Sequence, residues 1–153
     1  MRVIGIIPAR YASSRFRGKP LVDILGKSMI QRVYEQSKKC SLLIEVIVAT
    51  DSKRIFNHVL EFGGLAIMTD AEHQSGTDRC NEVAQKIDFQ YDIVVNIQGD
   101  EPYINPKQIE EVVNLFEDKD TQIGTLAKKI TTFDVIKDEN SPKAIFDANG
   151  NAL

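Results

Sequence analysis

The chain has 153 residues, of which 42% are hydrophobic and 27% are charged, close to the values of a soluble, single-domain globular protein. Its net charge of −3 excludes a general electrostatic attraction to nucleic acid or to an anionic membrane, so any phosphate site must be local. No apolar stretch approaches the about 20 residues that a membrane-spanning helix needs. We therefore expect a cytoplasmic enzyme domain in which Cys40 and Cys80, far apart in sequence, are free thiols.

Short apolar runs alternate along the chain with runs whose apolar residues recur at helical spacing. The elements predicted in chain order are a strand at Val3–Ile7 closed by Pro8, a helix at Ser28–Lys39, a strand at Glu45–Thr50, a helix between Ser52 and Gly63, a strand at Leu65–Met68, a helix at Thr77–Ile87, a strand at Ile93–Ile97, a helix from Asn105 to Phe116, and strands at Ile123–Ile130 and Lys143–Phe146. This alternation predicts an α/β fold, with a mostly parallel sheet covered by helices on both faces.

The most informative segment is residues 96–102, which follows the last buried strand of this alternating region. It places Gln98, Gly99, Asp100 and Glu101 at the carboxyl end of a strand, where ligands bind in open α/β sheets. Gly99 has no Cβ and allows a ligand to approach the backbone closely. A carboxylate at this position needs a partner, and Mg²⁺ takes one or two protein carboxylates together with phosphates. Asp100 is the predicted ligand, whereas Glu101 is either a second contact or a capping or solvent-exposed residue.

The first strand opens into a loop, residues 8–20, that contains four cations among small residues. These cations are Arg10, Arg15, Arg17 and Lys19. The loop has neither the Walker A pattern nor the Gly-x-Gly-x-x-Gly dinucleotide turn, but its composition is that of a polyphosphate clamp, because arginine binds phosphate in a bidentate manner. A solvated basic loop is the alternative interpretation.

These two segments are expected to face each other across one edge of the sheet. Cations that hold a triphosphate and a carboxylate that holds Mg²⁺ describe nucleotidyl transfer, in which positioning and charge stabilisation supply most of the rate. This chemistry requires no catalytic dyad, and the chain contains only two histidines, at positions 58 and 73.

The end of the chain carries a hairpin signal at Asn149-Gly150, followed by too few residues to form the returning strand. We therefore expect that the natural protein continues. Residues 1–153 are then a single nucleotide-binding α/β domain, the N-terminal part of a longer enzyme.

Five blocks in order resemble one enzyme family: residues 7–15, residues 18–21, residues 49–51, residues 73–79 and residues 96–102. Their sequences resemble those of the 3-deoxy-D-manno-octulosonate (Kdo) cytidylyltransferases, the CMP-Kdo synthetases of lipopolysaccharide biosynthesis. The resemblance continues through residues 124–127 to the end of the chain. It implies a three-layer α/β/α sandwich of the nucleotide-diphospho-sugar transferase type. It also implies an enzyme that transfers CMP from CTP to the anomeric hydroxyl of Kdo with Mg²⁺ and releases pyrophosphate.

The resemblance also implies roles for individual residues. Arg10, Lys19 and Asp100 are the catalytic residues, with Asp100 as the metal ligand and Gln98 as a contact to the sugar acid. The nucleotide-binding residues are Pro8, Ala9, Arg10, Arg15, Lys19, Gln74, Ser75 and Arg79. The family is longer than this chain, and the remainder is expected to supply a second metal-binding aspartate, most of the Kdo pocket and the interface of a homodimer. This chain alone is therefore expected to bind CTP weakly at best and to turn over little.

Simpler interpretations remain open for several of these residues. The segment 74–77 can be a loop with a helix cap, Arg79 an exposed helix charge, and Gln98 a side chain that bonds the backbone. Asp51 can bind a ribose or cap the next helix, and His73 can be an ordinary loop residue. The whole protein can also act on another sugar acid, such as a sialic acid, or be a nucleotide-binding module without turnover.

Overall fold

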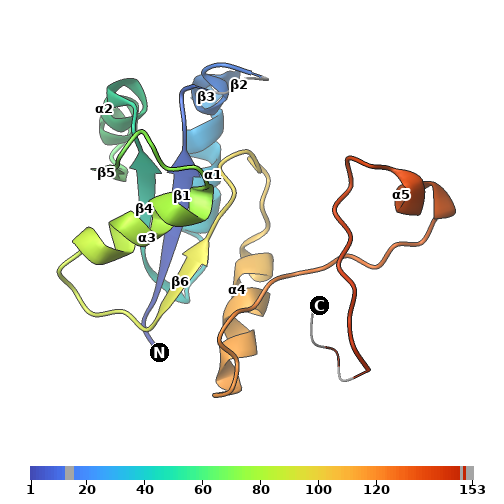
Figure 1. Cartoon of the computed structure of the whole chain (residues 1–153). Helices are drawn as coiled ribbons and strands as arrows, with labels where there is room; N and C mark the ends of the chain where they lie inside the picture. Colours follow the sequence, from blue (N-terminus) through green and yellow to red (C-terminus); the bar gives the residue numbers. More distant parts are fainter. Residues whose placement is uncertain (13–15, 149, 151–153) are drawn as a thin grey trace.

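The computed structural model describes residues 1–12, 16–148 and 150 (Figure 1). The elements in chain order are β1 (Val3–Ala9), the 3₁₀ turn η1 (Lys19–Leu21), β2 (Asp23–Ile24), β3 (Lys27–Ser28), α1 (Met29–Ser37), β4 (Leu43–Thr50), α2 (Lys53–Glu61), β5 (Leu65–Met68), α3 (Gly76–Lys86), β6 (Ile93–Asn96), α4 (Pro106–Asn114), the 3₁₀ turn η2 (Leu115–Glu117) and α5 (Phe133–Lys137). The four predicted strands and four predicted helices up to residue 117 are therefore confirmed, with ends that shift by one or two residues. Among the described residues, no helix is long and apolar enough to cross a membrane.

Four strands form a parallel sheet in the order β5-β4-β1-β6. Ala9 at the end of β1 lies opposite Thr50 at the end of β4, and Ile6 lies opposite Asn96 at the end of β6. Thr50 in turn lies opposite Met68, the last residue of β5. The carboxyl ends of all four strands consequently meet at one edge of the sheet, which places the loops that follow them side by side.

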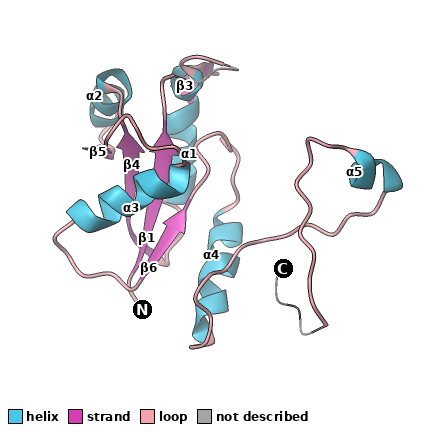
Figure 2. Ribbon diagram, in the orientation of Figure 1, coloured by secondary structure: helices cyan, strands magenta, loops and turns pink. Residues whose placement is uncertain are grey.

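Helices cover both faces of this sheet, as the alternation predicts (Figure 2). On one face, buried side chains of α1, α2 and α4 pack against the strands, among them Ile30, Val33, Ile55, Val59, Ile109 and Val113. On the other face, α3 packs through Cys80, Val83 and Ala84 against Ile4, Ile6, Ile47 and Ala49. The protein is thus a three-layer α/β/α sandwich. The candidate site lies at the edge of its sheet where the carboxyl ends of the strands meet.

Helix starts follow local sequence signals. The Ser28 side chain accepts a hydrogen bond from the Gln31 amide at 3.2 Å, as expected of an N-cap. Asn105 forms a capping box with Gln108, and Pro106 occupies the first turn of α4. Ser75 forms the corresponding capping box at the start of α3. These caps determine where each helix begins and therefore where the loops of the site end.

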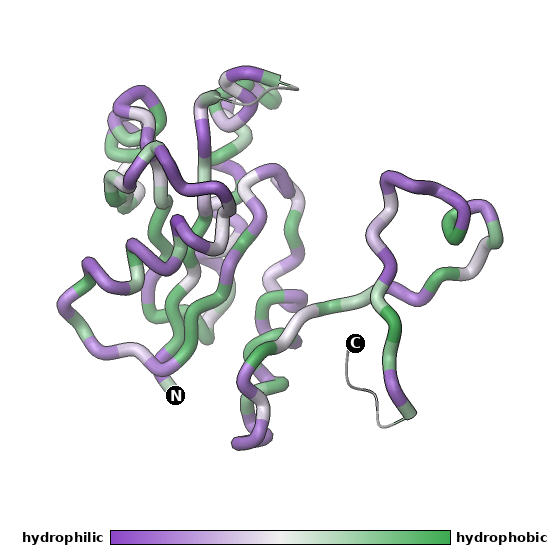
Figure 3. Tube along the Cα trace, in the orientation of Figure 1, coloured by the Kyte–Doolittle hydropathy of each residue, from purple (hydrophilic) through white to green (hydrophobic). Residues whose placement is uncertain are grey.

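The C-terminal arm, residues 118–148, departs from the prediction. Neither Ile123–Ile130 nor Lys143–Phe146 forms a strand, and the short helix α5 lies between them. Figures 1 and 3 show this arm leading away from the sheet with apolar stretches along it. Ile123 is 90% exposed and Ile145 is 68% exposed. The prediction fails because an apolar run becomes a strand only where a neighbouring strand bonds its backbone, and no described strand does so here. Asn149 of the expected hairpin lies outside the described residues, and Gly150 has a φ of +87°.

Candidate functional site

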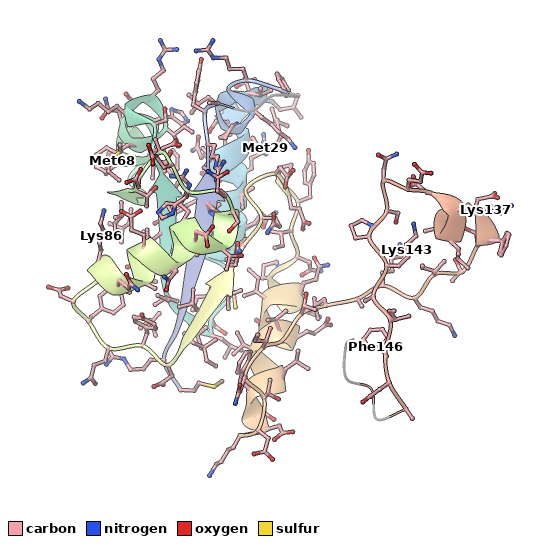
Figure 4. All side chains as sticks on the ribbon, in the orientation of Figure 1. Met29, Met68, Lys86, Lys137, Lys143 and Phe146 are labelled. Carbon is pink, nitrogen blue, oxygen red and sulfur yellow. The ribbon has the colours of Figure 1, made fainter. Side chains whose placement is uncertain are left out.

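The candidate site lies at the carboxyl edge of the sheet, where β1, β4, β5 and β6 deliver their loops. Figure 4 shows the side chains, with Met68 marking the end of β5 and Met29 the start of α1, both close to this edge. Three segments that are far apart in sequence meet there: the loop after β1, the loop between β5 and α3, and residues 97–102 after β6.

Pro8, near the end of β1, is the contact point for two of these segments. A Cβ placed on Gly76 would lie 3.1 Å from the Cγ of Pro8, and one placed on Gly99 would lie 2.9 Å from its carbonyl oxygen. Gly99 is thus required by packing within the chain, where the sequence suggested an approach to a ligand. Ala9, the last residue of β1, is buried, with 4% of the whole residue exposed.

Lys19 and Asp100 form an ion pair that joins the first loop to the segment after β6. The Lys19 Nζ lies 2.6 Å from the Asp100 Oδ2, although 81 residues separate the two in sequence. The two side chains are 37% and 51% exposed, so both groups are open to a ligand from solvent. The predicted juxtaposition of a loop cation with the carboxylate after β6 is therefore present.

Other cations of the first loop are held close to its ends. The Arg10 guanidinium donates a hydrogen bond through Nη2 to the carbonyl oxygen of His73. The guanidinium carbon of Arg17 lies 5.7 Å from the centre of the Tyr11 ring, and that of Arg54, which belongs to α2, lies 5.1 Å from it. These are cation–π distances. The loop is closed by the Gly18 amide, which donates to the Tyr11 carbonyl at 2.9 Å with φ of +74° at Gly18. Arg15 lies outside the described residues.

The loop before α3 carries Gln74 and Ser75, both exposed. The Gln74 side-chain amide donates to the Glu72 carbonyl at 2.8 Å. The Ser75 hydroxyl accepts from the Asp78 amide at 3.1 Å and donates to the Asp78 carboxylate at 2.7 Å. Hydrogen bonds from the Ser75 side chain and backbone lower the pKa of Asp78. Ser75 is therefore the N-cap of α3.

Arg79 is completely buried, so the interpretation as an exposed helix charge is wrong. Its guanidinium donates to the Asp51 carboxylate at 3.0 Å, to the Asp70 carbonyl at 3.1 Å and to the Thr69 hydroxyl. Asp51 follows β4 and Thr69 follows β5, so Arg79 ties the ends of two strands together. The N-cap of α2 is Ser52, so Asp51 does not cap that helix. The Asp51 carboxylate pairs with Arg79 of α3.

Sequence reasoning missed Glu82. Its carboxylate accepts from the Asp70 amide at 2.9 Å, pairs with the Lys86 Nζ at 2.5 Å and bonds the His73 ring through Nε2. The hydrogen bonds from Lys86, from the Asp70 backbone and from His73 lower the pKa of Glu82 to about 2. The one sequence signal for it is the spacing of four residues to Lys86, which is common on helix surfaces.

Gln98 lies in a different place from the ion pair. It lines a groove of about 480 Å³ between β6, α4 and residues 125–128, together with Asn96, Glu101 and Gln108. Lys19 and Asp100 do not belong to the lining of this groove. The structure thus brings together Arg10, His73 and Gln74 on one side of β1 and Lys19 with Asp100 on another, and sets Gln98 beside α4.

No cluster of three or more His, Cys, Asp or Glu side chains with metal-binding geometry occurs among the described residues. Asp100 carries an exposed carboxylate at this edge, beside Lys19 and next to the exposed Glu101. Carboxylate oxygens suit Mg²⁺, which typically binds one or two of them and completes its shell with water and phosphate oxygens. The donor set therefore fits a shared site.

Comparison with known proteins gives the family of the chain. The cytidylyltransferase family model matches residues 4–153. Over its whole length the chain is 54% identical to the 3-deoxy-manno-octulosonate cytidylyltransferase of Parabacteroides distasonis and 52% identical to that of Bacteroides thetaiotaomicron. It covers 62% of each relative, so it spans about 60% of the length of the curated relatives that it matches.

Solved structures give the same result. The chain is similar to CMP:2-keto-3-deoxy-manno-octonic acid synthetase complexed with CTP, with a TM-score of 0.74 and 49% identity over 77% of this chain and 48% of that one. A cytidylyltransferase from Leptospira borgpetersenii, at 24% identity and a TM-score of 0.67 over 80% of this chain and 52% of that one, shares the fold. The sandwich fold, the ion pair between the first loop and the segment after β6, and the match over residues 4–153 lead to one conclusion: the chain belongs to the cytidylyltransferase family.

Proposed function

We propose that the full-length protein transfers CMP from CTP to the anomeric hydroxyl of Kdo, with release of pyrophosphate, as a step of lipopolysaccharide biosynthesis. The observation that carries this proposal is the Lys19–Asp100 pair at 2.6 Å, which places a cation suited to phosphate beside a carboxylate suited to Mg²⁺. The choice of Kdo rests on the relatives about 50% identical that bear this name.

Arg10 and Lys19 hold the triphosphate in this proposal, with Arg15 as a third cation. Lys19 leaves Asp100 for phosphate oxygens when CTP arrives, because a triphosphate offers more negative charge than one carboxylate. Lysine then stabilises the charge that develops on the leaving pyrophosphate. Arg10 is oriented by its hydrogen bond to the His73 carbonyl, so its guanidinium is placed before the nucleotide binds.

Asp100 would hold Mg²⁺, together with a second carboxylate from the remainder of the protein. Such a cation would neutralise phosphate charge and make the attacking hydroxyl more acidic. Asp100 is 51% exposed and bonded to a flexible lysine, so it can exchange that partner for a cation without a change of the fold. Glu101 is the adjacent exposed carboxylate.

The nucleotide base and ribose lie against Pro8, the Ala9 backbone, Gln74 and Ser75. Gln74 and Ser75 are exposed at the N-terminal end of α3, where side chains and backbone donors can reach a nucleotide. Arg79 contributes to this site through Asp51, Thr69 and Asp70, because its guanidinium is buried against them.

Gln98 contacts the sugar acid in this proposal. Its position in the groove beside α4 supports a separate sub-site for the acceptor, next to the Lys19–Asp100 pair in sequence but lined by different residues. A carboxylate-bearing sugar is polar enough to need the amides and hydroxyls found there, among them Asn96, Gln108 and Thr125.

This chain is proposed to be one nucleotide-binding α/β domain that turns over little by itself, because Asp100 gives only part of a metal site. The full-length enzyme is proposed to be a homodimer. A cytoplasmic location agrees with Cys40 and Cys80, which are both free thiols in the structure.

Product analysis with two acceptors tests the proposal. The full-length protein with CTP and Mg²⁺ should convert Kdo into CMP-Kdo and leave N-acetylneuraminate unchanged, and a chelator should stop the reaction. Asp100→Asn should lower kcat by about 100-fold or more, because a metal ligand is lost. The exposed carboxylate of Asp88 is the matched control, and Asp88→Asn should keep normal turnover. Formation of CMP-N-acetylneuraminate, or full activity of Asp100→Asn, would contradict the proposal.

A further inference from the structure

The loop between β5 and α3, residues 69–75, is held by three charged side chains, two from α3 and one from the loop after β1. It carries Gln74 and Ser75, which are both exposed. Whatever fixes the position of this loop also fixes those two residues. The loop has no β-ladder bonds of its own beyond the amide of Thr69, which donates to the Thr50 carbonyl at 2.9 Å.

Glu82 is the residue that bonds this loop from α3. One carboxylate oxygen, Oε2, accepts from the Asp70 amide at 2.9 Å and from the His73 ring through Nε2. The other oxygen, Oε1, pairs with the Lys86 Nζ at 2.5 Å. The Glu82 side chain is 21% exposed, so it lies mostly under the loop, two helical turns from the N-terminus of α3. A single carboxylate thus holds the loop at its beginning and near its middle.

The same two loop residues also accept hydrogen bonds from arginines at their carbonyl oxygens. The Arg79 guanidinium donates to the Asp70 carbonyl at 3.1 Å, and the Arg10 guanidinium donates to the His73 carbonyl. Asp70 and His73 are therefore each bonded by Glu82 and by one arginine. His73 in particular lies between Glu82 and Arg10, and Arg10 is the cation proposed to hold the triphosphate.

We propose that Glu82 is a positioning residue for nucleotide binding: through Asp70 and His73 it fixes the loop that presents Gln74 and Ser75, and links that loop to Arg10. This inference rests on the proposed function, because it assigns Glu82 to the CTP site described above. Its role is to order the loop before CTP arrives, so that binding does not have to order the backbone. Glu82 itself does not touch the nucleotide.

The test compares Glu82→Gln with the unaltered full-length protein by calorimetric titration with CTP. The amide keeps the size of the side chain but has no charge and only one accepting oxygen, so it cannot accept from Lys86 while that oxygen serves the loop, and its bonds to the Asp70 amide and the His73 ring are weaker than those of a carboxylate. We expect Kd for CTP to rise by about fivefold or more, and KM for CTP to rise likewise while kcat stays within about twofold. Hydrogen exchange of the Asp70 amide should also become faster.

Glu45 offers a matched control. Its carboxylate accepts from a lysine, Lys38, at 2.9 Å and from a backbone amide, that of Val46, at 2.9 Å. It lies near the amino end of β4, at the opposite edge of the sheet. Glu45→Gln should therefore leave Kd and KM for CTP unchanged, although it removes a similar set of bonds.

His73→Asn gives a second, independent variant should Glu82→Gln prevent folding. It leaves Glu82 in place and removes the ring through which Glu82 reaches the middle of the loop, so Kd for CTP should rise by about twofold to fivefold. Unchanged CTP affinity in a folded Glu82→Gln or His73→Asn protein would overturn the inference and leave the proposed function intact. Absence of CTP binding by the unaltered protein would overturn the proposed function, and this inference with it.

Discussion

The prediction with the firmest structural basis concerns Arg79, whose replacement by methionine removes a buried charge and keeps most of the side-chain volume. The guanidinium bonds Asp51, Thr69 and Asp70, which follow the ends of β4 and β5. Arg79→Met leaves the Asp51 carboxylate without its partner and leaves two neutral groups with one bond fewer. The expected consequence is a marked loss of stability at the edge of the sheet that carries the site.

The magnitude follows from burial. Removal of one partner from a buried ion pair costs about 3–5 kcal/mol, because the other charge remains uncompensated. Two features place Arg79→Met at the lower end, at about 3 kcal/mol. The Asp51 side chain is 15% exposed and can gain water. The Nε of Arg79 is buried without a partner, so its removal relieves a penalty. For a chain of this length about 3 kcal/mol corresponds to a fall in Tm of roughly 6–12 °C.

Urea unfolding followed by circular dichroism measures this difference as a change in the free energy of unfolding. Lys107→Met is the control, because Lys107 is an exposed cation on α4 and its loss should change the free energy by less than about 0.5 kcal/mol. The double variant Arg79→Met with Asp51→Asn should recover about 1–2 kcal/mol, since it leaves no unpaired charge. A loss for Arg79→Met as small as that of the control would refute the role of Arg79 in holding β4 and β5 together.

Three further outcomes are expected. Gly99→Ala should lower the free energy of unfolding by about 1–3 kcal/mol in the same urea assay, because its Cβ would lie 2.9 Å from the Pro8 carbonyl oxygen; an unchanged midpoint would show that this contact is not tight. Burial raises the pKa of Cys80 to about 12 despite the neighbouring Arg79, so Cys80 should react with a thiol reagent at about pH 8 only after unfolding, and rapid labelling of the native protein would count against its burial. The pKa of Glu82 falls from 4.5 to about 2 through bonds from Lys86, Asp70 and His73, so its contribution to stability is present above about pH 4.5 and is lost as the pH falls toward 2. Since solvent reaches Glu82, that contribution is on the order of 1–2 kcal/mol, and acid titration of Glu82→Gln should show a shallower loss of stability over this range than the unaltered protein does.

The main elements of the sandwich could be predicted from sequence because each has a strong local signal. The apolar runs of β1, β4 and β6 and the capped helices α1, α3 and α4 are examples. One boundary was wrong for a reason that the pattern cannot show: β1 continues through Pro8 to Ala9. The Ile6 carbonyl accepts from the Ile97 amide at 2.9 Å, so the backbone polar groups of Ile6 point toward the β6 side of β1. Because these groups alternate along a strand, the backbone groups of Pro8 point to the same side. The β1–β6 ladder ends at Ile6, and the absent N–H of Pro8 therefore interrupts no ladder bond.

The hairpin of β2 and β3 had no usable signal. Its turn places Leu25 at φ of +53° and Gly26 at φ of +82°, and a leucine in the left-handed region is uncommon. Leu25 is also 88% exposed, contrary to its apolar character. In α2, Leu60 is apolar yet 49% exposed, whereas Ile55 and Val59 are buried in the core.

The candidate site was predictable to the extent that it depends on loop position. Lys19 and Asp100 were expected at one edge of the sheet, and topology brings them together. The environments of Arg79 and Glu82 depend on which strand ends lie beside α3, and that information is tertiary. A cation on a helix has the same sequence pattern whether it faces solvent or, as Arg79 does, a buried carboxylate.

The most direct test of the central proposal is a calorimetric titration of the full-length protein with CTP, UTP and ATP, with and without Mg²⁺. The account predicts that CTP binds at least about tenfold more tightly than UTP or ATP, that Mg²⁺ strengthens its binding, and that Lys19→Met weakens it by a similar factor. Equal affinity for the three nucleotides, or CTP binding that is insensitive to Lys19→Met, would contradict the proposal that this edge of the sheet is a cytidine triphosphate site.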